Sequence, residues 1–188
     1  MRYIRFYCTV CELALLLTFN FALTVPATEK AFSQSAQRAT SIHPWVGFNP
    51  GSWVEIKSTS VTKTAGKEKT NIIGTKITLL EKTADKVVLE NVMTIDGDTT
   101  KTKFDQPLKG YSDDEPEGMT ILKIGRDTIT IAGKPVACET MEALMNVGDT
   151  KTLFKRWTSG QVPGSLVKMV TSCDGSQSTA VVVDFKIY

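Results

Sequence analysis

Few side chains in this sequence are suited to catalysis. His43 is the single histidine, and no Gly-x-Ser-x-Gly motif accompanies it. A zinc site needs several nitrogen or sulfur ligands, and one histidine with the two cysteines of the domain does not supply them. We therefore expect no enzyme activity, no metal site and no cofactor.

The carboxylates offer little more. The run from Asp113 to Glu117 holds four acidic residues, and carboxylate oxygens are the ligands that calcium prefers. The run lacks the ordered spacing of a calcium-binding loop. We interpret it as a solvated acidic loop.

Two cysteines lie in the C-terminal half. In an oxidising compartment, Cys138 and Cys173 are candidates for one disulfide. They fall on two predicted strands with a third, residues 151–158, between them. In a plain meander they would lie two strand spacings apart, about 9.5 Å, whereas a disulfide needs Cα atoms within about 7 Å. Either the bond forms and the strands are not a plain meander, or the thiols are not bonded; we favour the bond.

Four aromatic residues are the candidates for ligand binding. They are Trp45 and Phe48 in the segment His-Pro-Trp-Val-Gly-Phe, then Trp53 and Trp157. Such a cluster either lines an apolar pocket or closes one end of a β-sheet core. Both interpretations stay open at this stage.

The first 27 residues have the order of a secretory signal peptide. Arg2 and Arg5 precede an apolar run from Leu13 to Val25, which ends in small residues at Ala27. A membrane-spanning helix needs about 20 apolar residues, and this run has thirteen. We expect cleavage after Ala27, no stable membrane anchor afterwards, and a periplasmic or secreted protein.

The charges argue against a nucleic-acid partner. The chain has 22 basic and 20 acidic residues, and removing the leader leaves 20 and 19. Nucleic-acid sites concentrate Lys and Arg on one face, which this near balance does not favour. We expect residues 28–44 to form a polar tether or short helix, and residues 45–188 to form one β-rich domain.

Alternating apolar and polar residues predict strands along most of that domain. We predict about nine strands, beginning near Trp53 and ending with residues 180–187. In the last strand Val181, Val183 and Phe185 share one face. Asp96-Gly97 predicts a tight hairpin turn. Nine strands with short connections predict an all-β, mainly antiparallel fold, a curved half-barrel or barrel-like sheet.

One turn-and-strand pattern occurs twice. The heptapeptide at residues 50–56, Pro-Gly-Ser-Trp-Val-Glu-Ile, is echoed at residues 163–169 as Pro-Gly-Ser-Leu-Val-Lys-Met. The pattern indicates either a duplicated half with two equivalent rims or two unrelated hairpins that converged on one turn. We favour convergence, because Pro and Gly suit such a turn for local reasons.

The C-terminal third resembles periplasmic lipoprotein-carrier (LolA/LppX-like) half-barrel proteins. The resemblance covers about forty residues and rests on Lys155-Arg156-Trp157, Val162-Pro163-Gly164 and Leu166-Val167-Lys168. It implies a curved antiparallel sheet around an apolar cavity that receives acyl chains. No functional residue of that family is carried over to this chain.

Two functions follow as hypotheses. The first is an exported binding module that holds an apolar small molecule or a lipidated partner. The second is a structural or protein-interaction domain of the cell envelope, with a filled core, no small-molecule ligand and another envelope protein as partner.

Overall fold

The computed structural model describes residues 43–64, 67–108, 119–147, 150–173 and 175–188. The predicted leader and most of the predicted tether lie outside these residues, as does the acidic run. The part of the chain that is described contains strands and turns and no helix. All nine strands lie within the predicted domain.

The strands follow one another with short connections, except between the fourth and fifth. They are β1 (Trp53–Thr64), β2 (Lys67–Lys82), β3 (Lys86–Ile95), β4 (Asp98–Pro107), β5 (Met119–Ile131), β6 (Lys134–Val147), β7 (Thr150–Thr158), β8 (Leu166–Cys173) and β9 (Ser176–Lys186).

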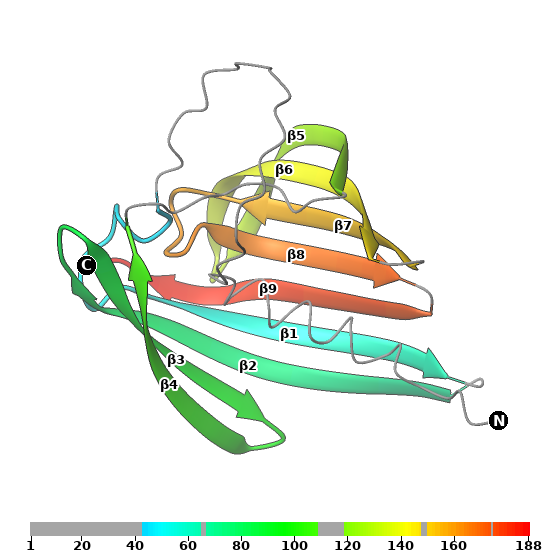
Figure 1. Ribbon diagram of the computed structural model, residues 1–188, viewed down its shortest axis with the longest axis horizontal. Helices are drawn as coiled ribbons and strands as arrows, with labels where there is room; N and C mark the ends of the chain where they lie inside the picture. Colours follow the sequence, from blue (N-terminus) through cyan, green and yellow to red (C-terminus); the bar gives the residue numbers. More distant parts are fainter. Residues whose placement is uncertain (1–42, 65–66, 109–118, 148–149, 174) are drawn as a thin grey trace, which may run out of the picture.

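All nine strands form a single antiparallel sheet in the order β4-β3-β2-β1-β9-β8-β7-β6-β5. The sheet consists of two meanders, β1 to β4 and β5 to β9, which the β1–β9 pair joins at the centre. Strands β4 and β5 are consecutive in the chain and form opposite edges (Figure 1). The sheet is curved and does not close, so the prediction of an all-β half-barrel is confirmed.

Tight turns set the register of two hairpins. Asp96 and Gly97 have φ angles of 51° and 93°, and Ala132 and Gly133 have 47° and 80°. Two successive left-handed residues are the signature of a type I′ turn, whose twist matches that of the flanking strands. The predicted reversal at Asp96-Gly97 is confirmed, because Ile95 pairs directly with Asp98.

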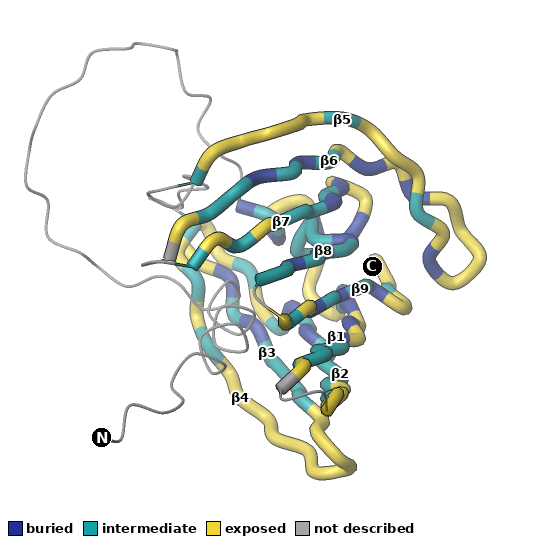
Figure 2. Tube along the Cα trace, turned by 90° about the vertical axis from the view of Figure 1, so that its right-hand side faces the viewer, coloured by how far each residue is buried: buried dark blue, intermediate teal, exposed yellow. Residues whose placement is uncertain are grey.

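One face of the sheet is buried, and we call it the inner face. Along the central strands, alternate residues are buried, such as Val54 and Ile56 on β1 and Val167 and Met169 on β8. Their cross-strand neighbours on β2 and β3, Leu79 and Leu89 among them, share that face. The edge strands β4 and β5 are mostly exposed, and the strands between them carry most of the buried residues (Figure 2).

The last strand buries the opposite residues from those that its apolar pattern emphasises. Ala180 and Val182 of β9 are buried, whereas Val183 is 39% exposed. The register explains this result, because Ala180 lies between Ser58 of β1 and Met169 of β8 on the inner face. Val181 therefore lies on the outer face, and Val183 falls at a register shift and is exposed. Beyond that shift Phe185 pairs with buried Val54 and packs against the core, so the three residues predicted to share a face do not do so.

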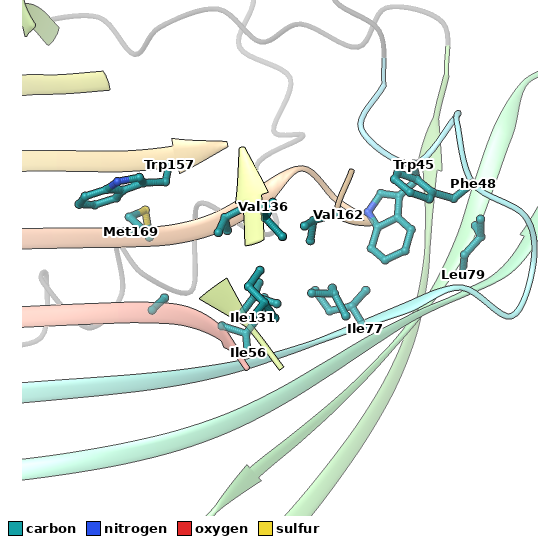
Figure 3. Packing of buried hydrophobic residues seen from close by; sticks show 14 of the residues in the cluster. Trp45, Phe48, Ile56, Ile77, Leu79, Ile131, Val136, Trp157, Val162 and Met169 are labelled. Atoms are coloured by element: carbon teal, nitrogen blue, oxygen red, sulfur yellow. The ribbon is translucent and has the colours of Figure 1, made fainter. Parts of the chain in front are cut away.

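The hairpin of β5 and β6 changes the side that it buries along its length. Near its tip Val136 and Cys138 are buried, and farther along Met141 and Ala143 are, which are of the opposite parity. The tip residue Ile131 is 1% exposed and belongs to the same core cluster as Val136 and residues of β1 and β2 (Figure 3). This arrangement closes one end of the core.

The predicted disulfide is corrected by the structure. No bond links Cys138 to Cys173. Strands β6, β7 and β8 form a plain meander, and β7 pairs its Thr158 end with Glu139 and its Leu153 end with Ser172. The two cysteines therefore lie two strands apart and near opposite ends of the strands, about 24 Å apart along the strand direction at 3.4 Å per residue.

Candidate functional site

The turn at His43–Phe48 closes the same end of the core as the hairpin tip. The backbone N–H groups of Val46 and Phe48 donate to the carbonyls of His43 and Trp45, at 3.0 and 3.1 Å. The rings of Trp45 and Phe48 meet edge to face with centroids 6.4 Å apart, and both are buried in the core cluster (Figure 3). We call residues 43–48 the plug.

A lysine of the sheet fixes the plug. The ammonium group of Lys82 donates to the carbonyl oxygens of Val46 and Phe48, at 3.1 and 2.6 Å. These contacts satisfy carbonyls that the short turn leaves without backbone partners. Burial lowers the pKa of His43, an effect that a hydrogen bond with the side chain of Gln106 opposes.

The repeated Pro-Gly turns each accommodate an aromatic ring. A Cβ atom on Gly164 would lie 3.2 Å from the ring of Trp45, and one on Gly51 would lie 3.3 Å from the ring of Tyr188. Both glycines have positive φ, 78° and 94°. Strands β1 and β8 flank β9 and run in the same direction, so the two turns lie at one end of the sheet.

The other two predicted aromatic residues occupy outer-face positions in the register, each beside lysines, and Trp157 is nevertheless buried as part of the core cluster. The Nζ atom of Lys76 lies 4.0 Å from the ring centroid of Trp53. Those of Lys155 and Lys168 both lie 4.9 Å from the ring centroid of Trp157. Such cation–π contacts, with the aliphatic stems of the lysines, cover aromatic surface that would otherwise face water.

A carboxylate orients the indole of Trp157. Its Nε1 donates to Oδ2 of Asp127 at 2.8 Å, and the backbone N–H of Thr128 donates to the other carboxylate oxygen. The hydrogen bond from Trp157 lowers the pKa of Asp127, as does the one from Thr128. Asp127 therefore stays ionised and is held in place on β5.

The four predicted binding residues thus do not gather at one place. The structure brings Trp45 and Phe48 together in the plug and gives Trp53 and Trp157 outer-face positions in the register, although Trp157 is buried and also belongs to the core cluster. Of the four, Phe48 alone lines the groove described below. A role for any of them in binding stays a prediction.

The methionines form a set that the sequence analysis missed. The sheet register places all five methionines of the described strands on the inner face, namely Met93, Met119, Met141, Met145 and Met169. Met119 pairs directly with Met145. Methionine is flexible and polarisable, and it adapts to ligands of differing shape. In the sequence, the only sign of this set is that Met141 and Met145 are an even number of residues apart on one strand. That spacing places them on one face, and only the register shows which face it is.

Part of the inner face, beyond the packed core, is accessible. The side chains of Ile73, Met93, Met145 and Phe154 are half-buried, and Ile121 at the β5 edge is 39% exposed. Apolar surface in this position is available to a ligand without disturbing the core around the plug.

An open groove of about 1410 Å³ lies beside the plug. It is bounded by the plug, the β5–β6 hairpin, and the loop between β7 and β8. Its lining contains four charged residues, which are Arg126, Asp127, Glu139 and Arg156. The groove is therefore polar where the remainder of the inner face is largely uncharged.

Two kinds of feature are absent from the residues that the structure describes. Within them, no group of three or more His, Cys, Asp or Glu side chains is placed to hold a metal ion. In the same residues, no helix has the length and apolar character needed to cross a membrane.

Comparison with known proteins gives only distant structural likeness. The sequence matches no model of a protein family and no curated protein. Among solved structures, the chain is similar to a DUF1329 family protein from Desulfovibrio piger, with 9% identity and a TM-score of 0.27. That likeness covers 73% of this chain and 85% of the other. It is too distant to carry an argument about activity, and the resemblance to lipoprotein carriers stays a prediction.

Proposed function

We propose that this protein is an exported binding module that holds an apolar small molecule or a lipidated partner on its inner face. The observation that carries the proposal is the placement of all five described methionines on that face, several of them half-buried. Flexible apolar side chains that are not packed tightly into a core suit a ligand of variable shape.

The partition of charge supports the same proposal. The central strands carry their lysines on the outer face, as the pairing of Lys57 with Val181 and of Lys168 with Val181 shows. On the inner face of these strands, hydroxyl and apolar side chains take the corresponding positions, such as Ser58, Ala180 and Met169. An apolar ligand would thus meet little desolvation cost there.

The experiment that tests the proposal is uptake of a fluorescent fatty-acyl probe by the purified protein. Met145→Gln should weaken probe binding about tenfold, because burying a methionine against a ligand contributes on the order of 1.5–3 kcal/mol. The matched control is Leu144→Gln, at the adjacent half-buried position on the outer face, which should leave binding unchanged.

Native mass spectrometry of protein purified from its own envelope provides a second measurement. We expect an added mass that organic extraction removes. A protein that is always empty and takes up no acyl probe would contradict the proposal.

One observation favours the alternative of an interaction domain. Strand β5 is an edge strand, and Ile121, Leu122 and Ile124 on it are 39%, 54% and 71% exposed. An exposed apolar edge is a template for pairing with another chain. Crosslinking in cells from position 124 should then capture one recurrent envelope protein, and a monomer that crosslinks to nothing would exclude this alternative.

A further inference from the structure

Arg156 places a guanidinium group among apolar residues of the inner face. In the sheet it lies between Met141 of β6 and Met169 of β8. Its side chain is half-buried, and within the described parts of the chain it forms neither an ion pair nor a hydrogen bond. Guanidinium groups bind carboxylates and phosphates through paired hydrogen bonds, so an arginine without such a partner is available to an anion.

The groove as a whole is electrically balanced, with Arg126 and Arg156 against Asp127 and Glu139. Only the face that Arg156 shares with Arg126 and Glu139 has a positive excess. Arg126 and Glu139 pair directly across β5 and β6, and Glu139 lies opposite Thr158, two residues beyond Arg156. Two guanidinium groups therefore flank one carboxylate. Asp127, the remaining acidic residue of the groove, already accepts hydrogen bonds at both of its oxygens.

The groove and the methionine-bearing inner face meet at Arg156. The arginine lines the groove beside the plug, while its two cross-strand neighbours on the inner face are methionines. Along β6 that face continues from Met141 through Ala143 to Met145, a distance of about 14 Å at 3.4 Å per residue. A charged group at Arg156 would thus lie at one end of an apolar track.

We propose that Arg156, assisted by Arg126, binds the carboxylate or phosphate head group of an amphiphile whose apolar chain lies along the methionines of the inner face. This inference rests on the proposed function and adds the charge of the ligand and the position of its head group. The ligand class is an anionic, single-chain or acyl-bearing amphiphile.

Calorimetric titration tests the inference with four probes below their micelle-forming concentrations. These are dodecanoate, dodecyl phosphate, uncharged methyl dodecanoate and inorganic phosphate. The two anionic amphiphiles should bind at least about tenfold more tightly than the methyl ester, as expected for a charge-assisted hydrogen bond. Inorganic phosphate should bind far more weakly than dodecyl phosphate.

Three variants assign the preference to the arginine. Arg156→Gln should reduce the affinity for dodecanoate to that of the methyl ester and leave the ester unchanged. Arg156→Lys should keep part of the preference, because it retains the positive charge and loses the paired hydrogen bonds. Lys57→Gln removes a cation from the exposed outer face and should have no effect.

The outcomes separate the two proposals. Equal affinity for charged and uncharged chains overturns the head-group site and leaves the apolar site standing. Binding of no amphiphile overturns the proposed function. If inorganic phosphate binds as tightly as dodecyl phosphate, the proposal of an amphiphilic ligand is overturned and Arg156 belongs to a plain anion site. If Arg156→Gln fails to fold by near-ultraviolet circular dichroism, the lysine variant and the comparison of probes on the unchanged protein still decide.

Discussion

At the scale of the residue, the two Pro-Gly turns have a steric role as well as a conformational one. Gly164 combines a φ of 78° with a ring of Trp45 packed against its Cα, whereas Gly133 has nearly the same φ of 80° and nothing within 4 Å of its missing side chain. Comparing Gly133 with Gly164 separates the free-energy cost of a left-handed backbone from the free-energy cost of displacing an aromatic ring.

We predict that Gly133→Ala lowers the free energy of unfolding by about 1 kcal/mol, the usual cost of a left-handed alanine. Gly164→Ala should lower it by about 2–3 kcal/mol, because the added methyl group also pushes on the indole of Trp45. Urea denaturation measures both. Equal losses for the two variants would show that Trp45 moves aside without cost.

The aromatic residues illustrate what single residue types predict. Trp45 and Trp157 are both buried, yet one belongs to the plug and the other is covered by two lysines and held by Asp127. The sequence indicates only that a large aromatic ring has to be accommodated at each position. It does not indicate which face it occupies, because that depends on cross-strand neighbours far away in the chain.

At the scale of the element, the plug is an irregular segment that packs on the core, and it contains one titratable side chain. His43 is 3% exposed, and it is the only histidine of the chain. Because burial lowers its pKa in the folded state, the unfolded chain binds a proton at a higher pH than the folded one does.

We therefore predict that the free energy of unfolding decreases as the pH falls below about 6.5, the unperturbed histidine value, toward the lower folded-state pKa. Above that value the stabilisation is fully present. Denaturant unfolding at about pH 7.5 and pH 5.5 measures the decrease, since carboxyl groups titrate mostly below this window. His43→Gln should show a flatter dependence; an equally steep one would place the titrating group elsewhere.

Hairpins were the elements best predicted from the sequence. Asp96-Gly97 forms its tight turn as expected, since the requirement for two left-handed residues is local. The face of β9 was not predictable in the same way. Its apolar alternation emphasises Val181 and Val183, but the register with β1 and β8 turns Ala180 and Val182 inward.

At the scale of the whole molecule, strand number and class could be predicted, and strand order could not. Most strands carry their own alternating pattern and short turns separate them, so about nine strands and an antiparallel sheet follow from local sequence. The pairing of β1 with β9 has no signature in the local sequence. The methionine-bearing inner face and the groove at Arg156 depend on cross-strand registers of this kind. The disulfide prediction was wrong for the same reason, since Cys138 and Cys173 would be close only in some strand orders.

The central β1–β9 pair also determines how the chain could be rearranged without altering the sheet. The C-terminal residue lies beside the start of β1, because the side chain of Asn49 donates to the carbonyl of Tyr188, and the N–H of Tyr188 donates to the hydroxyl of Ser52. A circular permutant that links Tyr188 to His43 and begins at Met119 would read β5-β6-β7-β8-β9-β1-β2-β3-β4. In that chain every hydrogen-bonded strand pair is a pair of sequence neighbours.

We predict that this permutant forms the same sheet and folds faster, because the long loop closure between Trp53 and Lys186 becomes a local connection. Circular dichroism and stopped-flow refolding measure the two properties. A permutant that does not fold would show that the covalent link between the two edges of the sheet is essential. If it folds, the sheet is a plain nine-strand meander that forms wherever the chain ends are placed.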